Sequence, residues 1–122
     1  MIILVRGVRG AISVDKNEPD EILERVGELL LAMVHENEIQ TEDIASIAFS
    51  STPDLNAAFP ALAARKLGWI EVPLFGTQEI DCPTGLPRCI RVIILLNTDL
   101  PQNAIKHIYL REAIVLRPDF KR

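Results

Sequence analysis

The sequence predicts an α+β domain built on a mixed five-stranded β-sheet with helices packed on one face. Two observations carry this prediction: five stretches have the apolar character or alternation of strands, and two stretches between them have the features of helices, the first of them amphipathic. Their order along the chain is β, α, β, α, β, β, β. The 122 residues are enough for one core and too few for two, so we expect a single domain over 1–122, with a short flexible tail from about 118 to 122.

The first strand is expected over residues 2–14, where arginines alternate with small and apolar residues. Alternation places Arg9 on one face of the strand together with Ala11. Gly7 and Gly10 bracket Arg9 and would let another backbone or a ligand come close. Their spacing is not that of a dinucleotide-binding fingerprint.

An amphipathic helix is expected next and ends near His35. Asn17 suits the N-cap, and Pro19 suits the first turn. From Ile22 onward apolar residues recur at steps of three and four. The acidic residues and Arg25 take the opposite side, which we expect to face solvent.

Shorter elements fill the middle of the chain. A helical turn at 41–43 precedes a second strand at 47–51, and a second helix runs from Pro60 to the stop signal Gly68. A third strand is expected over 70–75.

This third strand is placed near a sheet edge because Pro73 interrupts it. A loop is expected at 76–85. The last elements are a helical turn at 101–105, a strand at 107–110 and a short apolar return at 113–116.

The most apolar run of the chain, Cys89–Leu96, is predicted to be a strand covered on both faces. It contains Arg91, which has no acidic neighbour in the sequence. An arginine in such a run needs a partner because an unpaired buried charge is costly. The partner is either a carboxylate from elsewhere, for which Glu79 is a candidate, or an anionic ligand. The residues alone leave both open.

Composition narrows the kind of protein. The net charge of −4 argues against nucleic acid as a partner. Cys82 and Cys89 form neither a disulfide framework nor a zinc motif, and no run is long enough to span a membrane, so we expect a cytoplasmic protein with no membrane partner. Helices on one face leave the other face of the sheet bare. With a mean hydropathy of +0.20, that bare face predicts a homo-oligomer.

Several kinds of chemistry lack their motifs. Ser50 and Ser51 are not in a nucleophile elbow, no phosphate-binding loop occurs, and the two histidines are too far apart for a helical metal motif. Arginines at structured positions remain, together with Glu79 and Tyr109. Such a set suits orientation and electrostatic stabilisation of a small polycarboxylate.

Each of these residues also has an ordinary structural reading. Arg9 fits the surface of a strand, and Arg65 complements the dipole at a helix end. Tyr109 fits a core position with its hydroxyl at the rim.

Seven fragments in register resemble the trimeric α/β class of monofunctional chorismate mutases, which is distinct from the all-helical class. The resemblance covers nearly the whole chain. The fragments are RGVRGA (6–11), TPDLNAAFPA (52–61), QE (78–79), CIRV (89–92), NTDLPQ (97–102), HIYL (107–110) and VLRPD (115–119).

This resemblance implies an enzyme that converts chorismate to prephenate by an intramolecular Claisen rearrangement, on the route to phenylalanine and tyrosine. It implies a homotrimer whose sheets form a central pseudo-barrel, with sites in the clefts between subunits. The reaction is pericyclic, so the resemblance implies no cofactor, metal or covalent intermediate.

Roles for individual residues follow from the resemblance. Arg91 would stabilise the ether oxygen, Arg9 would bind a carboxylate, and Glu79 would accept the ring hydroxyl. The implied substrate-binding residues are Tyr109, Phe59, Ala61, Arg65, Leu74, Phe75, Gly76, Leu116 and Arg117.

The chain departs from the family pattern at the periphery of the site. Leu62 stands where lysine can occur, and Phe75-Gly76 where threonine and cysteine can occur. The alternatives are a trimeric imine deaminase, which also anchors a carboxylate with a strand arginine, and a non-catalytic module that binds a small regulatory ligand.

Overall fold

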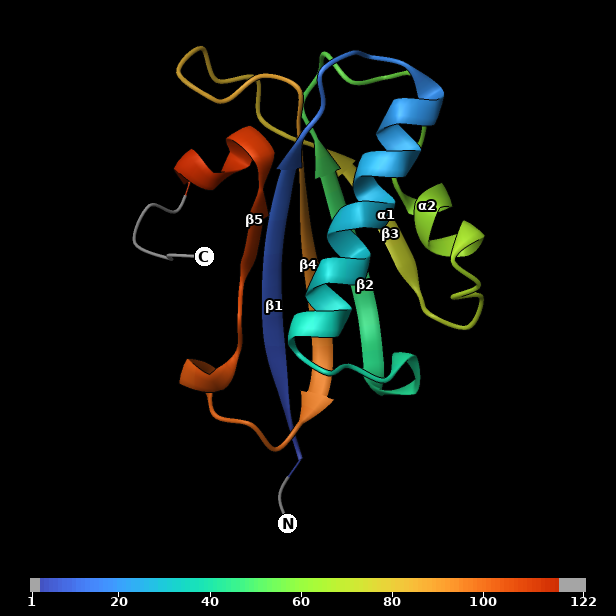
Figure 1. Ribbon diagram of the computed structural model, residues 1–122, viewed down its shortest axis with the longest axis vertical. Helices are drawn as coiled ribbons and strands as arrows, with labels where there is room; N and C mark the ends of the chain where they lie inside the picture. The colour runs from blue at the N-terminus through green and yellow to red at the C-terminus, as the bar shows by residue number, and fades with distance from the viewer. Residues whose placement is uncertain (1–2, 117–122) are drawn as a thin grey trace.

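The computed structural model describes residues 3–116, and its elements follow the predicted order (Figure 1). Residues 1–2 and 117–122, which include the tail predicted from about 118 to 122, lie outside the described residues. The strands and helices are β1 (Leu4–Ser13), α1 (Pro19–Glu36), β2 (Ile44–Ser51), α2 (Ala61–Lys66), β3 (Leu74–Gln78), β4 (Cys89–Thr98) and β5 (Ile108–Leu110). Short 3₁₀ helices are η1 (Thr41–Asp43), η2 (Gln102–Ala104) and η3 (Arg111–Leu116).

The five strands form one mixed sheet in the order β3-β2-β4-β1-β5. The central strand β4 is antiparallel to both β1 and β2, whereas the edge strands β3 and β5 run parallel to β2 and β1. Figure 1 shows α1 and α2 on the same face of the sheet. The predicted fold class, a mixed sheet with helices on one face, is therefore confirmed.

The main core lies between α1 and the sheet. The apolar stripe of α1 is buried, from Ile22 to Met33, and packs on alternate residues of the strands. Gly10 leaves room for its neighbours: a Cβ atom there would be 2.6 Å from the Met33 sulfur of α1 and 3.1 Å from the backbone carbonyl oxygen of Ile108. Glycine therefore permits this close approach, as the sequence indicated.

The opposite face of the sheet is open in the single chain. The alternate residues of β4 that point to it include Ile93 and Leu95, which are 37% and 36% exposed, and Phe75 of β3 is 67% exposed. The prediction that the Cys89–Leu96 strand is covered on both faces is therefore wrong for one chain. A strand in an antiparallel pairing can bury one face and leave the other open.

The third strand begins at Leu74 and continues to Gln78, so its predicted position at 70–75 is wrong. Pro73 has no N–H to donate and stands immediately before the strand, where only its carbonyl is used; it accepts from the N–H of Ile47 at 3.0 Å. The predicted edge position is confirmed, because β3 ends the sheet. The shift brings Gly76, which was expected to open a loop, into the strand.

Asn17 does not cap α1, contrary to the prediction. The N-cap residue is Glu18, which makes no side-chain capping bond. The Asn17 side chain instead accepts from the N–H groups of Asn56 and Ala57, at 3.1 and 3.0 Å, and so links the two connections at this end of the sheet.

No helix within residues 3–116 is long and apolar enough to cross a bilayer.

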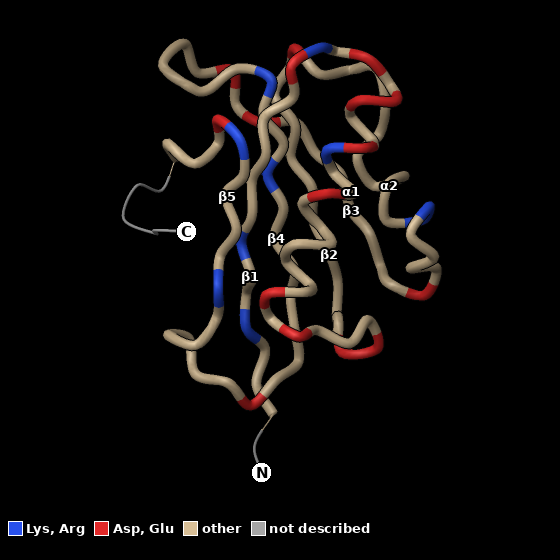
Figure 2. Tube along the Cα trace, in the orientation of Figure 1, with Lys and Arg blue, Asp and Glu red and all other residues tan. Residues whose placement is uncertain are grey.

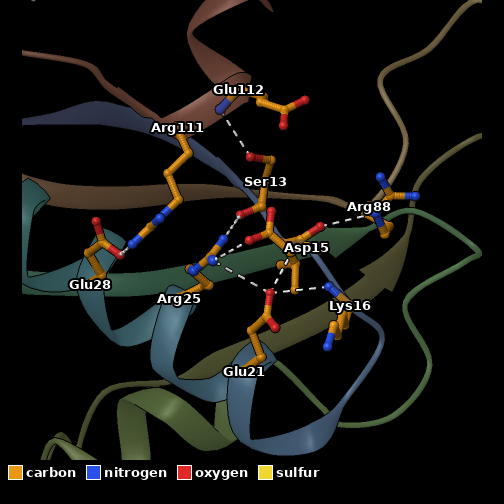
Figure 3. A network of polar contacts seen from close by, with 10 residues as sticks. Ser13, Asp15, Lys16, Glu21, Arg25, Glu28, Arg88, Arg111 and Glu112 are labelled. Atoms are coloured by element: carbon orange, nitrogen blue, oxygen red, sulfur yellow. Dashed lines mark hydrogen bonds and ion pairs between the residues drawn. The ribbon is translucent and has the colours of Figure 1, made fainter.

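Arg25 was expected to face solvent and is in fact 8% exposed, at the centre of a polar network (Figure 3). Its guanidinium donates to the carbonyl of Ser13 and to the Asp15 carboxylate, both at 2.9 Å, and lies 3.5 Å from Glu21. Helical periodicity alone could not place these partners, because two of them lie outside the helix.

The same network extends to η3. The Ser13 hydroxyl accepts from the N–H of Glu112 at 3.0 Å, and Arg111 forms an ion pair with Glu28 of α1 at 3.0 Å (Figure 3). Arg111 has a positive φ of 55°, a conformation that costs a non-glycine residue energy and needs support from its surroundings. The network thus fixes η3 against the end of β1.

Loss of the Asp15 charge should weaken the fold at low pH. The hydrogen bond and the charge of Arg25 hold the pKa of Asp15 below its ordinary value. A carboxylate with a lowered pKa in the folded state stabilises the fold above its unfolded pKa, near 3.9, and this contribution is lost as the pH falls through the folded pKa.

We therefore expect the urea concentration at the midpoint of unfolding to decrease when the pH is lowered below about 4. The decrease should be smaller in Asp15→Asn than in the wild type. Asp99→Asn, at an exposed carboxylate, serves as the control and should follow the wild type. Identical pH profiles for the wild type and Asp15→Asn would contradict this role.

Candidate active site

A row of side chains crosses the open face of the sheet, one from each strand. The ladder registers place Arg91 of β4 opposite Ser50 of β2 and opposite Ala11 of β1. Because residues opposite each other point to the same face, the row is continuous. From β3 to β5 it consists of Thr77, Ser50, Arg91, Ala11 and Tyr109.

This row and the one beside it, which contains Arg9, line a cavity of about 190 Å³. Three of the residues predicted for the site, Arg9, Arg91 and Tyr109, therefore lie together. A wider hollow of about 710 Å³ adjoins the cavity at Arg91 and contains Glu79 and the 80–87 loop. The sequence assigned Glu79 to the same site as the three residues of the cavity. The folded chain brings the four residues together, around the cavity and the hollow that adjoins it.

The guanidinium of Arg91 is only loosely paired. Its Nε atom is buried and makes no hydrogen bond to any residue in 3–116. The nearest carboxylate oxygen, Oε1 of Glu79, is 3.7 Å away, which is too far for a hydrogen bond. That oxygen accepts instead from the hydroxyl of Ser50 at 2.6 Å. Glu79 is thus a counter-ion of Arg91 by charge, but it leaves an N–H group of the arginine open.

The charge balance of the cavity favours an anionic ligand. Arg9 and Arg91 contribute two positive charges, against the single carboxylate of Glu79. Figure 2 shows basic residues along β1 and β4, while acidic residues gather on α1 and in the connections. The backbone N–H of Arg9 donates to Nδ1 of His107 at 3.0 Å, which ties the arginine's backbone to the start of β5.

A small second core closes one side of the cavity. It consists of Ala11, Cys89, Tyr109 and Ala113, with Leu116 packed against it. Two residues predicted for the site therefore belong to this second core: Tyr109 is one of its buried members, and Leu116, at the end of η3, packs against it. Burial raises the pKa of the Cys89 thiol to about 11, although the charge of Arg91 acts in the opposite direction.

Cys89 should therefore be inert in the folded protein. The thiolate is the reactive form of cysteine, and Cys89 is 1% exposed. In a Cys82→Ser variant, which leaves Cys89 as the single cysteine, Ellman's reagent at pH 8 should react roughly 100-fold more slowly than in denaturant. Equal rates in the two conditions would contradict the burial of this side chain.

A second group of predicted residues lies elsewhere. Phe59, Ala61, Arg65 and Gly76 line a groove of about 730 Å³ between α2 and β3, on the side of the sheet that carries the helices. Phe59 is 83% exposed in this groove. One chain does not bring this group into the Arg91 cavity.

The remaining predicted residues take intermediate positions. Leu74, at the start of β3, is partly buried against the main core. Phe75 is exposed on the open face, opposite Ala48 of β2. Arg117 lies outside the described residues.

Ser50 and Thr77 line the cavity although the sequence did not single them out as site residues. Thr77 fell in a stretch predicted as a loop. Ser50 gave one usable signal, a polar residue after the apolar run of residues 47–49 in β2, but its position next to Arg91 depends on the strand register. Among residues 3–116, no three His, Cys, Asp or Glu side chains lie close enough to hold a metal ion.

Fold and cavity together define a class: a small α+β protein with an arginine-lined cavity on the open face of its sheet. Comparison with known proteins gives the family. The model of the type I chorismate mutases matches residues 5–120. The chain therefore belongs to the type I chorismate mutase family, and it is an isomerase.

Individual relatives agree with this assignment. The chain is 50% identical over 119 residues to the chorismate mutase AroH of Thermus thermophilus, covering 97% of this chain and 98% of the relative. It is 45% identical over 118 residues to the chorismate mutase AroH of Bacillus subtilis, covering 96% and 93%. A solved chorismate mutase from Clostridium thermocellum superposes with a TM-score of 0.88 at 46% identity, covering 89% of this chain and 97% of that one.

Proposed function

We propose that this chain converts chorismate to prephenate in a cleft completed by a neighbouring subunit of a homotrimer. The observation that carries the proposal is the buried, unbonded Nε of Arg91 in a cavity that also holds Arg9 and Tyr109. An open N–H on a charged group in a partly dry site is costly unless a ligand atom satisfies it. Membership of the type I chorismate mutase family supports chorismate as that ligand.

The residues act on a reaction that is unimolecular and pericyclic. Chorismate carries two carboxylates, and its breaking ether bond leaves partial negative charge on oxygen. Arg91 donates to that oxygen, so its contribution is larger in the transition state than in the ground state. Such preorganised donors account for most of the rate enhancement in many enzymes.

Other residues hold the substrate in its reactive shape. Arg9 binds a carboxylate and thereby selects the folded conformer in which the reacting carbons meet. Glu79 accepts the ring hydroxyl through the carboxylate oxygen that Ser50 does not use. Tyr109 and Leu116 contribute to the wall at the side-chain carboxylate.

The division of the predicted residues into two groups supports a shared cleft. Phe59, Ala61 and Arg65 lie at the β3 edge, away from the Arg91 cavity, and would serve the cavity of the next subunit. The open face carries exposed Phe75 and Ile93, which is apolar surface of the kind that oligomers cover. Arg117, immediately after η3, would add positive potential at the mouth of the cleft.

The whole chain then acts as one domain, and we place it in the cytoplasm. Both cysteines are free in the fold, Cys89 in the core and Cys82 at the surface, which suits a reducing compartment.

A direct assay tests the proposal. Purified protein is mixed with chorismate and the loss of its ultraviolet absorbance is followed against a buffer blank, while sedimentation equilibrium gives the mass in solution. Turnover by a species of three chains is expected. No acceleration over the blank would overturn the proposed activity, and binding without turnover would indicate a regulatory module. A stable monomer with full activity would contradict the shared cleft.

A further inference from the structure

Ser50 lies between the two charged residues that face each other in the site. It is the register partner of Arg91 on one side and of Thr77 on the other, and its side chain lines the Arg91 cavity. Its hydroxyl donates to Oε1 of Glu79 at 2.6 Å. The same oxygen is the one that faces Nε of Arg91 at 3.7 Å.

The geometry of this trio is unusual for a carboxylate and a guanidinium that are free to meet. A charge-assisted N–H···O bond would close to about 2.7–2.9 Å, and the attraction would strengthen as the distance shortened. Here the pair stays apart, and Nε of Arg91 makes no hydrogen bond within residues 3–116. The backbone of Glu79 is also held, since its N–H donates to the carbonyl of Ser51 at 2.8 Å. The side chain of Glu79 is therefore fixed by Ser50 rather than by Arg91.

We propose that Ser50 is a positioning residue for the reaction: it holds the Glu79 carboxylate away from Arg91, so that the arginine's N–H stays open for the substrate oxygen. The inference rests on the proposed function and deepens it. Without the hydroxyl, Glu79 would close on Arg91 and form an internal ion pair. The substrate would then have to displace that pair, and Glu79 would no longer be aimed at the ring hydroxyl.

A double-mutant cycle separates this role from ordinary strand packing. Ser50→Ala should raise KM and lower kcat/KM by about tenfold or more, because a hydrogen bond to a charged group is lost and a competing ion pair forms. Ser50→Thr, which keeps the hydroxyl, should retain activity within a few-fold of wild type. In a Glu79→Gln background, where the charge attracted to Arg91 is absent, Ser50→Ala should change kcat/KM by less than about twofold.

Ser46→Ala is the matched control, since Ser46 lies on the same strand and points to the same face, opposite Leu95 and outside the cavity. It should behave as wild type. Thermal melts of all variants show whether each one folds. If Ser50→Ala is destabilised, a Ser50→Thr variant with the melting temperature of the wild type still tests the role of the hydroxyl.

The outcomes are distinguishable. Wild-type turnover with an unchanged Ser50→Ala would overturn the inference and leave the proposed function intact. An equal loss in the wild-type and Glu79→Gln backgrounds would also overturn it, because Ser50 would then act independently of the Glu79 charge. Absence of chorismate turnover in the wild type would remove the proposed function and the inference with it.

Discussion

Replacement of Arg91 by alanine is expected to lower kcat by about two to three orders of magnitude, because the preorganised donor to the ether oxygen is lost. The arginine is well placed for this role. It projects from the central strand β4, which is paired on both sides, and its Nε is buried without a hydrogen-bond partner among residues 3–116. The fold thus holds an open donor in position before substrate arrives.

The measurement is kcat at saturating chorismate, compared with wild type and with two controls. Arg91→Lys keeps the charge but not the planar fork, and should recover only part of the loss. Arg6→Ala removes the same charge from β1, where the guanidinium donates to the carbonyl of Leu100 at 2.9 Å. It should leave kcat nearly unchanged. An Arg91→Ala enzyme within a few-fold of wild type would show that the ether oxygen is stabilised by something else.

Replacement of Arg9 by alanine is expected to lower kcat/KM by roughly 10- to 100-fold, mainly through a higher KM. A hydrogen bond between charged groups contributes about 1.5–3 kcal/mol, and Arg9 is assigned to a substrate carboxylate. The side chain is exposed in the single chain, while its backbone is held by His107. The substitution should therefore leave the fold intact and weaken binding.

Titration calorimetry with prephenate, a product that carries two carboxylates, provides an independent readout. The dissociation constant should rise in Arg9→Ala by about the same factor as KM. Arg6→Ala again serves as the control on the same strand. Unchanged affinity in Arg9→Ala would mean that this arginine does not anchor a carboxylate.

Much of the fold follows from periodicity and composition. Alternation in the first strand placed Arg9 and Ala11 on the same face, and the structure has both of them on the open face of the sheet. The bare face predicted from helices on one side is present, with exposed Phe75 and Leu95. The third strand was misplaced because Pro73 was taken as an interruption within it, whereas a residue without an N–H donor stands immediately before the strand's first residue, Leu74.

Side-chain contacts between segments that are far apart in the chain could not be predicted from the sequence. Arg25 has the spacing of a solvent-facing residue in α1, and only the folding of Asp15 and Ser13 onto it explains its burial. The tether from Ser50 to Glu79 depends on the register of β2 and on the end of β3. Local patterns carry no information about either.

The candidate site was likewise predicted in part: its residues followed from the sequence, but their arrangement within one chain did not. Arg91, Arg9, Glu79 and Tyr109 were chosen from the sequence through the family pattern, and they lie around one cavity and the hollow that adjoins it. The pattern did not indicate that Phe59, Ala61 and Arg65 would lie apart from them within one chain. That separation supports the proposed cleft shared between subunits.

A subunit-mixing experiment tests this shared cleft most directly. Arg91→Ala disables the β4 side of a site, and Arg65→Glu reverses a charge on the α2 side, so each variant alone should be nearly inactive. When the two are unfolded and refolded together in equal amounts, about a quarter of the interfaces should combine an intact β4 side with an intact α2 side. Recovery to about a quarter of wild-type activity is expected from a shared cleft. A mixture no more active than the average of the two separate variants would contradict it.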